Sequence, residues 1–435
     1  MLFRLLANSS RMTHFLFMNN KKILAVILFT IFVDVIGIGL LIPIFPLLLA
    51  NPSSPYYLLG NISLNQGYIL LGYLSAIFSI MVFLMAPIFG ELSDRYGRKK
   101  ILALALTGTS LSYVLFAIGI ILRDIPLLFI SRAIDGISGS SIAAAQAAIA
   151  DISKSEERAK NFGLIGAAFG LGFIIGPFLG GKLSDSTVVG WFNATTPFWF
   201  AAFLSAINVV FILTVFKETN TSPNDKLKIT FFKAFTNIIR AFKLQDVRSI
   251  LLTNFFLQGG FTFFTTFFAV YLVSKFGFTQ GNTGDYFAYI GFWAIIAQAL
   301  ILPIFTKRYR EDKILRFSLL FISIFILANA LAQNVWQLLL ITPLFSIANG
   351  LSGANMTSLM SKSADKKTQG EILGINASIA NLAQAIPPIL SGYIAARFLP
   401  SATIFVSAAV VFLAWLTFVL LFKPKTECEW NAENC

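Results

Sequence analysis

The sequence predicts an all-α integral membrane protein whose twelve transmembrane helices form two six-helix bundles. Composition, the length of the apolar runs and an internal repeat each support this fold class. Hydrophobic residues make up 57% of the 435-residue chain and charged residues only 12%, whereas an average soluble protein has roughly 25% charged residues. The apolar residues gather in runs of about 20, the length that a helix needs to cross the hydrocarbon core.

Twelve such runs follow one another, and their alternation with polar segments sets the expected organisation. The alternating pattern of a membrane β-strand is absent, so we expect every crossing to be a helix. The predicted crossings are 23–48, 67–89, 101–122, 127–150, 161–183, 197–216, 248–273, 286–306, 315–333, 336–360, 371–396 and 401–422. The predicted regions are an N-terminal segment (1–22), a first bundle (23–216), a linker (217–247), a second bundle (248–422) and a tail (423–435).

The two halves of the chain repeat each other at an offset of 211 to 214 residues. The matches are "RYGRKKIL" (95–102) with "RYREDKIL" (308–315), "GISG" (136–139) with "GLSG" (350–353), and Gly163, Pro177 and Gly181 with Gly374, Pro388 and Gly392. Three independent matches at nearly one offset predict two bundles of equal topology with a substrate path between them.

The distribution of basic residues predicts the orientation. Of the 33 Lys and Arg residues, 28 fall in the termini and in the alternate connections on one side, and only four fall on the other. The positive-inside rule therefore places both termini in the cytoplasm. The net charge of +13 does not indicate a nucleic-acid partner, because the basic residues form no patch interleaved with aromatic residues.

Four motifs resemble those of a known family. "GELSDRYGRKK" (90–100) resembles the signature between helices two and three of the major facilitator superfamily. "GIGLLIPIFPLLL" (37–49), "RAIDG" (132–136) and "GFIIGPFLGG" (172–181) resemble motifs of its drug/proton antiporter branch. Residues 32–49 and 149–181 are most similar to tetracycline–proton antiporters. The resemblance implies the major facilitator fold, and it implies a multi-pass protein of a bacterial inner membrane that exports an amphiphilic small molecule or drug against protons by alternating access.

The charged connection at 90–100 is the candidate conformational lock, with five residues: Gly90, Asp94, Arg95, Gly97 and Arg98. Asp94 can accept hydrogen bonds from the N-terminus of a helix, which the family fold places at the start of crossing eleven, near residue 370. The two arginines can pair with acids of the next turn on this side: Asp151, Glu156 and Glu157. The alternative is a simple positive-inside anchor, which explains the basic residues but not the two glycines and Asp94.

Three charges lie deep within the predicted crossings: Asp34, Arg132 and Asp135. At 1.5 Å per residue, Asp34 is ~16 Å from the inner face and Asp135 ~12 Å from the outer face. These depths nearly coincide in a core of ~30 Å. Because intramembrane charges are costly and usually functional, we expect Asp34 to carry the proton and Arg132 to respond to its protonation. The alternative is a structural Arg132–Asp135 pair with Asp34 capped by its neighbours.

The antiporter motif supplies a set of small residues on crossing five: Gly172, Gly176, Pro177, Gly180 and Gly181. The glycines lie nearly on one helical stripe and allow another helix to approach closely, while the proline bends the chain. The resemblance favours a role in sealing the bundle interface and in gating. Tight packing alone is the alternative.

The crossings of the second bundle contain almost only uncharged residues. We therefore expect its part of the substrate cavity to use amides, together with aromatic side chains: Asn254, Gln258, Gln298, Asn349 and Asn376. Such a lining suits a bulky amphiphile. The sequence has no nucleotide-binding motif and no metal cluster, so we expect a monomeric transporter without cofactor, metal or enzyme activity, whose partners are its substrate, protons and the lipid bilayer.

Two departures from the tetracycline antiporters bear on the substrate. Ser112 stands where that family carries an acid on helix three, and Asp135 is an acid where the family has an uncharged residue. We therefore expect a substrate other than a metal–tetracycline complex. The open alternatives are an exporter of an endogenous metabolite such as a siderophore, a proton-coupled nutrient importer, and a transporter-like receptor or scaffold that moves nothing.

Overall fold

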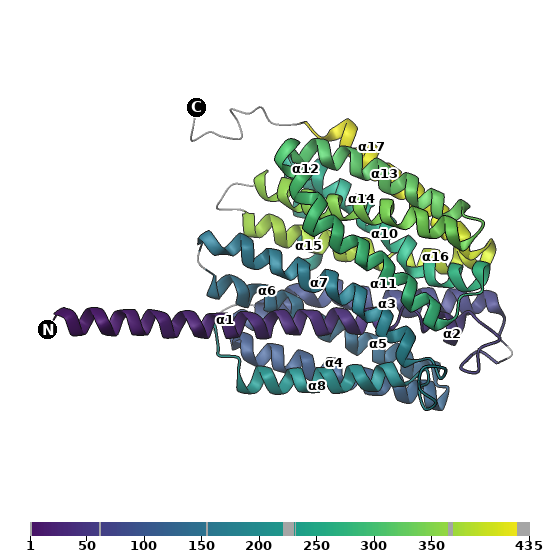
Figure 1. Cartoon of the computed structure of the whole chain (residues 1–435), viewed down its shortest axis with the longest axis horizontal. Helices are drawn as coiled ribbons and strands as arrows, with labels where there is room; N and C mark the ends of the chain where they lie inside the picture. Colours follow the sequence, from purple (N-terminus) through teal and green to yellow (C-terminus); the bar gives the residue numbers. More distant parts are fainter. Residues whose placement is uncertain are drawn as a thin grey trace.

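The protein is built from helices that run roughly side by side in two groups (Figure 1). The computed structural model describes residues 2–60, 62–153, 155–220, 230, 232–363 and 369–423, and this part of the chain contains no strand. Twelve of its helical segments are long and apolar enough to cross a membrane, from Lys21–Leu49 to Pro400–Leu421. The predicted all-α membrane fold with twelve crossings is therefore confirmed.

The first bundle contains the helices of crossings one to six. They are α1 (Leu2–Leu40) with α2 (Phe45–Leu49), α3 (Leu64–Tyr96), α4 (Arg98–Leu122), α5 (Ile125–Gly139) with α6 (Ser141–Ile152), α7 (Ser155–Leu183) and α8 (Thr196–Thr214). Helix α3 is longer than the predicted crossing because Ser63 and Gln66 form a capping box at its start. At its other end it runs through the charged residues as far as Gly97, whose φ of 98° ends it.

The second bundle contains crossings seven to twelve. They are α10 (Gln245–Phe276), α11 (Gln280–Ile296) with η1 (Ala297–Ile301) and α12 (Leu302–Arg308), α13 (Glu311–Leu331), α14 (Val335–Lys362), α15 (Gln369–Ala385) with α16 (Pro387–Arg397), and α17 (Pro400–Leu421). Proline explains two of the breaks, since it cannot donate a backbone hydrogen bond. Pro387 and Pro388 separate α15 from α16, and Pro303 follows the π-helical turn η1.

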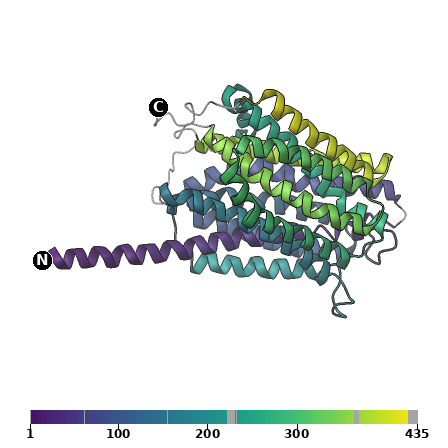
Figure 2. The ribbon, with the colours of Figure 1, turned by 45° about the horizontal axis from the view of Figure 1, so that its top comes forward.

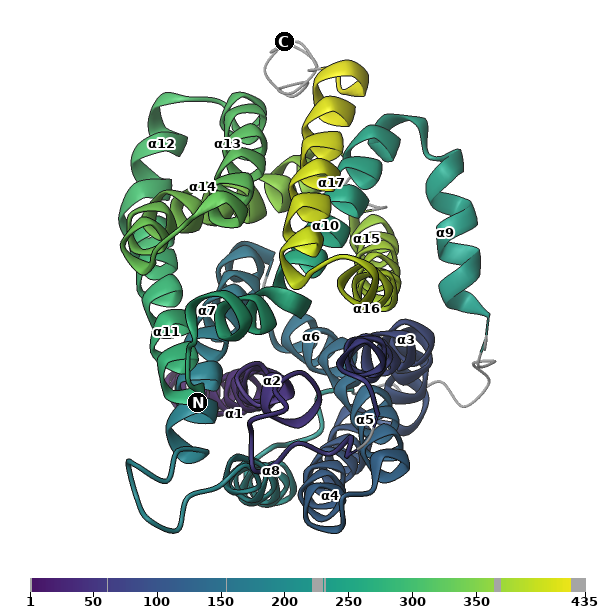
Figure 3. The same cartoon turned by 90° about the vertical axis from the view of Figure 1, so that its right-hand side faces the viewer.

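The two bundles lie side by side, with the first below and the second above in the end-on view of Figure 3. Successive crossings alternate in direction, so the connections lie on two sides. We call the side that carries the connection between α3 and α4 the basic side, and the side that carries the connection between α1 and α3 the opposite side. Figure 2 shows α1 extending beyond the bundles on the basic side.

Within the first bundle, α1 and α7 pack in direct backbone contact. A Cβ at Gly176 would lie 2.7 Å from the Ile36 carbonyl oxygen and 2.8 Å from the Gly39 Cα. Gly172 and Gly180 face α1 in the same way, one turn to either side. Lipid supplies no hydrophobic drive for helices to associate, so close contact of this kind holds them together.

Between the bundles, two glycine pairs meet near the opposite side. A Cβ at Gly72 would lie 2.5 Å from the Pro388 carbonyl oxygen and 3.1 Å from the Gly392 Cα. A Cβ at Gly181 would lie 2.5 Å from the Gln280 carbonyl oxygen and 3.0 Å from the Gly284 Cα. Gly72 corresponds to Gly284, and Gly181 to Gly392, at the offset of the internal repeat. The two contacts are thus related by the pseudo-symmetry of the bundles.

Polar contacts reinforce both glycine pairs. The hydroxyl groups of Tyr73 and Tyr393 are 2.9 Å apart beside the first pair. Lys182 donates to Asp285 at 2.9 Å beside the second pair. The opposite side is therefore closed by contacts between α3 and α16 and between α7 and α11.

Toward the basic side, glycines of α7, α14 and α15 have no neighbour among the described residues. Cβ atoms built at five positions would meet no described atom within 4 Å: Gly163, Gly166, Gly170, Gly353 and Gly374. The linker between the bundles, predicted at 217–247, contains a further helix, α9 (Lys233–Lys243). Figure 3 shows α9 at the edge of the molecule, beside α15 and α10.

The contact between α1 and α7 predicts a difference between two glycines of the same helix. Gly176→Ala forces a methyl group against backbone atoms that cannot move aside, so we expect destabilisation of about 1–3 kcal/mol. Gly166→Ala meets no neighbour within 4 Å and favours the helix, so we expect neutral or slightly higher stability. Thermal unfolding of both purified variants in detergent measures the difference. Equal melting temperatures would show that α1 and α7 are not packed as described.

Candidate functional site

A cluster of buried charges lies in the middle of the first bundle. Asp34 of α1 and Arg132 and Asp135 of α5 are 5%, 4% and 3% exposed. Arg132 Nη1 donates to Asp135 Oδ2 one helical turn away. Asp34 is joined to the same stretch of chain, because it accepts a hydrogen bond from Ser141, six residues after Asp135. The structure thus brings together all three intramembrane charges that the sequence singles out.

Asp34 is only half satisfied. Its Oδ2 accepts a hydrogen bond of 2.9 Å from the Ser141 hydroxyl, while its Oδ1 is buried without a hydrogen-bond partner among the described residues. Arg132 pairs with Asp135, as the structural alternative expects. The free oxygen of Asp34 departs from that alternative, because a capped carboxylate would have donors on both oxygens.

Aromatic side chains surround the charges on the neighbouring helices. The Arg132 guanidinium lies 4.4 Å from the centre of the Phe78 ring, a cation–π contact. Gly136 allows it, because a Cβ there would lie 2.5 Å from the Phe78 carbonyl oxygen. Tyr113 of α4 is 3% exposed, and its hydroxyl fills the space where Gly37 lacks a side chain.

Sequence reasoning missed three of these neighbours: Phe78, Tyr113 and Ser141. Phe and Tyr occur along many of the crossings, and one serine among several on α5 and α6 carries no signal of its own. The one available clue was the glycine four residues after Arg132, which marks a close approach of another helix.

The charge balance of the cluster determines its chemistry. Two ionised carboxylates and one guanidinium leave a net charge of −1 in a place where an uncompensated charge is costly. Binding of one proton makes the cluster neutral. The arrangement can therefore take up and release a proton, and Asp34 has the oxygen that is free to receive it.

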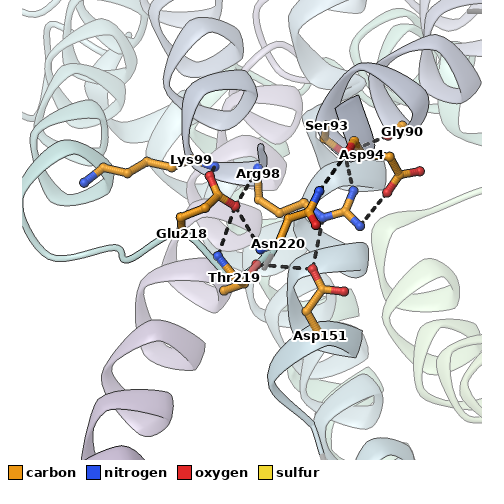
Figure 4. Close-up of polar contacts among 9 residues, drawn as sticks. All are labelled: Gly90, Ser93, Asp94, Arg98, Lys99, Asp151, Glu218, Thr219 and Asn220. Atoms are coloured by element: carbon orange, nitrogen blue, oxygen red, sulfur yellow. Dashed lines mark hydrogen bonds and ion pairs between the residues drawn. The ribbon is translucent and has the colours of Figure 1, made fainter. Parts of the chain in front are cut away.

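Arg98 is the centre of the charged connection on the basic side (Figure 4). Its guanidinium pairs with Asp94 at 2.6 Å and Asp151 at 3.1 Å. It also donates to the Ser93 hydroxyl at 2.5 Å. Only 8% of the Arg98 side chain is exposed, although it lies at the start of a helix. One of the predicted pairings, Arg98 with Asp151, is thus present.

The start of the linker closes over the same connection. The Glu218 carboxylate accepts hydrogen bonds from the backbone N–H groups of Arg98 (2.9 Å) and Lys99 (3.1 Å), which are the first of α4. An anion at a helix N-terminus is favoured by the orphan N–H groups and the helix dipole. Asn220 donates to the Asp94 carbonyl oxygen at 2.8 Å, as Figure 4 shows.

Glu218 also explains why residue 97 is glycine. A Cβ at Gly97 would lie 2.5 Å from a Glu218 carboxylate oxygen, and the φ of 98° is one that other residues rarely adopt. Glu218 was not singled out from the sequence, because its partners are backbone groups about 120 residues away. Gly90 has no neighbour within 4 Å of a built Cβ, and its carbonyl oxygen accepts from Ser93 at 2.8 Å.

Among the described side chains, Arg95 forms no ion pair with Asp151 or Glu157. The Arg95 guanidinium lies 5.1 Å from the centre of the Tyr96 ring, and its Nε has no hydrogen-bond partner in the described part of the chain. Glu156 lies outside the described side chains. The bridge from Asp94 to the start of α15 involves residues that are partly undescribed, and it stays a prediction.

The antiporter motif divides between two tasks. Three of its glycines face α1 inside the first bundle, and Gly181 faces α11 of the second. The Pro177 carbonyl oxygen would lie 2.8 Å from a Cβ at Gly284, so Pro177 belongs to the contact between the bundles as well. Residues of the motif therefore pack α7 against α1 within the first bundle and against α11 of the second bundle.

The predicted amides of the second bundle form two groups. Asn254 of α10 donates to Asn376 Oδ1 of α15 at 2.7 Å, and the half-buried Gln258 lies one turn further along α10. Gln298 lies in η1 and is exposed, within a π-helical turn of a kind often found at functional sites. Asn349 precedes Gly350, where a built Cβ would lie 3.7 Å from Gln298 Cγ.

Among the described residues, no group of three or more His, Cys, Asp or Glu side chains could hold a metal ion. Asn254 and Asn376 pair within the second bundle, and the three buried intramembrane charges lie in the first bundle. This arrangement separates residues that can bind a neutral or amphiphilic molecule from residues that can bind a proton.

Comparisons with known proteins identify a family and relatives of this chain. The family model described as Major Facilitator Superfamily matches residues 27–386 and 290–433. The tetracycline resistance protein, class H, of Pasteurella multocida is 30% identical over 383 residues, which cover 86% of this chain and 89% of that protein. Multidrug resistance protein 1 of Bacillus subtilis is 29% identical over 377 residues, which cover 86% and 90%.

Solved structures share the fold. The crystal structure of the human organic anion transporter MFSD10 (TETRAN) matches with a TM-score of 0.70 and 22% identity, and the match covers 92% of this chain and 99% of that one. At this level of identity, the likeness concerns the arrangement of helices.

The contacts of Arg98 predict how the connection responds to loss of one charge. Arg98→Gln leaves Asp94 and Asp151 without their cation, so we expect a loss of about 1–3 kcal/mol and a loss of transport. Lys100→Gln removes the same charge from the same connection, but Lys100 is exposed. If the connection were only a positive-inside anchor, both variants would behave alike. Thermal unfolding and uptake into inverted vesicles distinguish the two outcomes.

Proposed function

The chain belongs to the major facilitator superfamily of transporters, and we propose that it exports an amphiphilic small molecule or drug in exchange for protons. The observation that carries this proposal is the half-satisfied carboxylate of Asp34 beside the Arg132–Asp135 pair. A group that only binds substrate or stabilises the fold does not need a free, buried acid oxygen.

The proton cycle follows from the competition for one arginine. In this structure Arg132 is paired with Asp135, so a proton is the remaining means of neutralising Asp34. We therefore assign the protonated form of Asp34 to this conformation. When the proton leaves, the ionised Asp34 competes with Asp135 for Arg132, and the contacts of α1 with α5 and α6 change.

Alternating access follows from the two sides of the molecule. The opposite side is closed by the glycine pairs, while five glycines toward the basic side have no neighbour within 4 Å in the described part of the chain. If the basic side faces the cytoplasm, this conformation is the inward-facing state. Release of the proton there and binding of the substrate precede the change to the outward-facing state, in which the glycine pairs separate.

The proposed class of substrate rests on the side chains of the second bundle and on the similar proteins. The second bundle offers amides, two of them already paired between α10 and α15, and many aromatic side chains. The similar proteins include tetracycline and multidrug resistance proteins. We propose that the protein contributes to antibiotic or multidrug resistance, as a monomer in a bacterial inner membrane with both termini in the cytoplasm.

Replacement of Asp34 tests the proton carrier. Asp34→Asn keeps the size of the side chain and mimics the protonated acid permanently, so we expect substrate binding to persist and proton-driven efflux to fall to background. The matched control is Asp124→Asn. Asp124 caps the start of α5 through Leu127, and asparagine caps a helix equally well.

The measurement is substrate transport in inverted vesicles with an imposed proton gradient, with and without an uncoupler, across pH 6 to 8. The substrate is first identified from a screen in an efflux-deficient host. Proton-dependent efflux by the Asp34→Asn variant at the control rate would exclude Asp34 as the carrier. If the uncoupler does not change the efflux rate of the unchanged protein, proton antiport is excluded.

The proposed orientation is tested by labelling cysteines. The natural residues Cys428 and Cys435 belong to the tail, so we expect a membrane-impermeant maleimide to label them in inverted vesicles and not in intact cells. With both changed to serine, Ser186→Cys on the opposite side should show the reverse pattern. Labelling of the tail in intact cells would contradict the orientation.

A further inference from the structure

Helix α9 joins the two bundles but belongs to neither. It follows the linker from α8 and precedes α10, and it contacts α3, α10 and α15. In the end-on view it runs across the direction of the transmembrane helices, at the edge of the molecule (Figure 3). Because the bundles already have their cores, the position of α9 requires a separate explanation.

Three faces of α9 meet three different surroundings. Ala234 and Ala241 are buried against the protein, at 1% and 5% exposed. An apolar face stays exposed beside them: Phe232 (72%), Phe235 (45%) and Ile239 (59%). At 100° per residue, the polar residues Thr236 and Arg240 lie 60° and 100° from Ile239, on the flank away from the buried alanines, and both are exposed.

The contacts with α3 set the depth of the helix. Glu91, near the charged end of α3, accepts from Lys233 Nζ and from the Thr230 backbone N–H, both at 2.7 Å. Phe235 packs edge-on against Phe83 at 5.4 Å between ring centres. Phe83 lies eight residues, or ~12 Å, further into the apolar part of α3. The apolar face of α9 is therefore on the membrane side and the polar face on the basic side.

The charge of α9 fits a negatively charged surface. Its sequence "KAFTNIIRAFK" contains three basic residues and no acid. An amphipathic helix with basic residues on the polar face and large apolar residues on the other is the kind that lies in the bilayer interface. The exposed phenylalanines also continue the lipid-facing surface of the crossings beside them.

We propose that α9 is a lipid-binding helix that lies in the bilayer interface on the basic side, with its three exposed apolar side chains among the acyl chains and the exposed Arg240 side chain toward anionic headgroups. The occupant of the exposed face is the bilayer itself. This inference rests on the chain spanning a membrane and is independent of the direction of transport and of the proton carrier.

The attachment of α9 to both bundles gives lipid binding a consequence. Glu91 holds its start to α3, while Asn237 donates to the Ser378 hydroxyl of α15 at 3.0 Å. Helices α3 and α15 belong to different bundles. Lipid that holds α9 in the interface therefore also holds the spacing of α3 and α15 on the basic side.

The test uses the full chain with Cys428 and Cys435 changed to serine, reconstituted in phosphatidylcholine nanodiscs. Phe235→Cys and Ile239→Cys carry a fluorophore on the apolar face, and Thr236→Cys carries it on the polar face as the matched control. We expect a lipid-phase quencher to reach positions 235 and 239, and a water-soluble quencher to reach position 236. Gel filtration confirms that each labelled variant is folded.

Two results would overturn the proposal. Equal quenching from water at all three positions would place α9 outside the bilayer, and protection of positions 235 and 239 from both quenchers would mean that a protein covers the face. The headgroup preference is tested with nanodiscs that contain phosphatidylglycerol. The Arg240→Gln variant should lose about fivefold of its enrichment of that lipid, and unchanged enrichment would exclude the headgroup role.

Discussion

Direct contact between helix backbones at glycine is the interaction on which this structure depends. In lipid, apolar side chains gain little by leaving one helix surface for another, so helices associate where small residues let their backbones touch. The protein uses this contact twice. It fixes α1 against α7 inside one bundle, and it joins the bundles at Gly72 with Gly392 and at Gly181 with Gly284. Among the described glycines, the joints between the bundles lie near the opposite side.

The sequence predicts the fold well, because hydrophobic length and the placement of basic residues are properties of a segment by itself. The twelve crossings follow from them, with ends that differ only where caps or charged residues extend a helix, as in α3. Hydrophobic length and charge placement do not predict helix α9. It is short and partly polar, and its three faces acquire meaning only from the protein and membrane surfaces that meet there.

The charged residues of the candidate site can be predicted from the sequence, but their uncharged partners cannot. Asp34, Arg132 and Asp135 are conspicuous because the membrane makes each of them costly, and the structure brings them together. Their partners are not conspicuous, since Ser141, Phe78 and Tyr113 are ordinary residues of an apolar helix. Glu218 shows the same limit on the basic side. It binds backbone N–H groups of α4, and every residue type except proline has such a group, so the sequence does not identify the partner.

The two bundles share a topology and meet through symmetric glycines, yet their contents differ. The buried charges lie in the first bundle, while the crossings of the second carry amides and aromatic rings in a setting without Asp, Glu, Lys or Arg between 317 and 361 or between 372 and 396. Under the proposed function, exchange of one amide or ring there changes the substrate that is bound and leaves the groups proposed to respond to protons in place. A protein divided in this way can acquire new substrates by drift in one half, while selection preserves the energy coupling in the other.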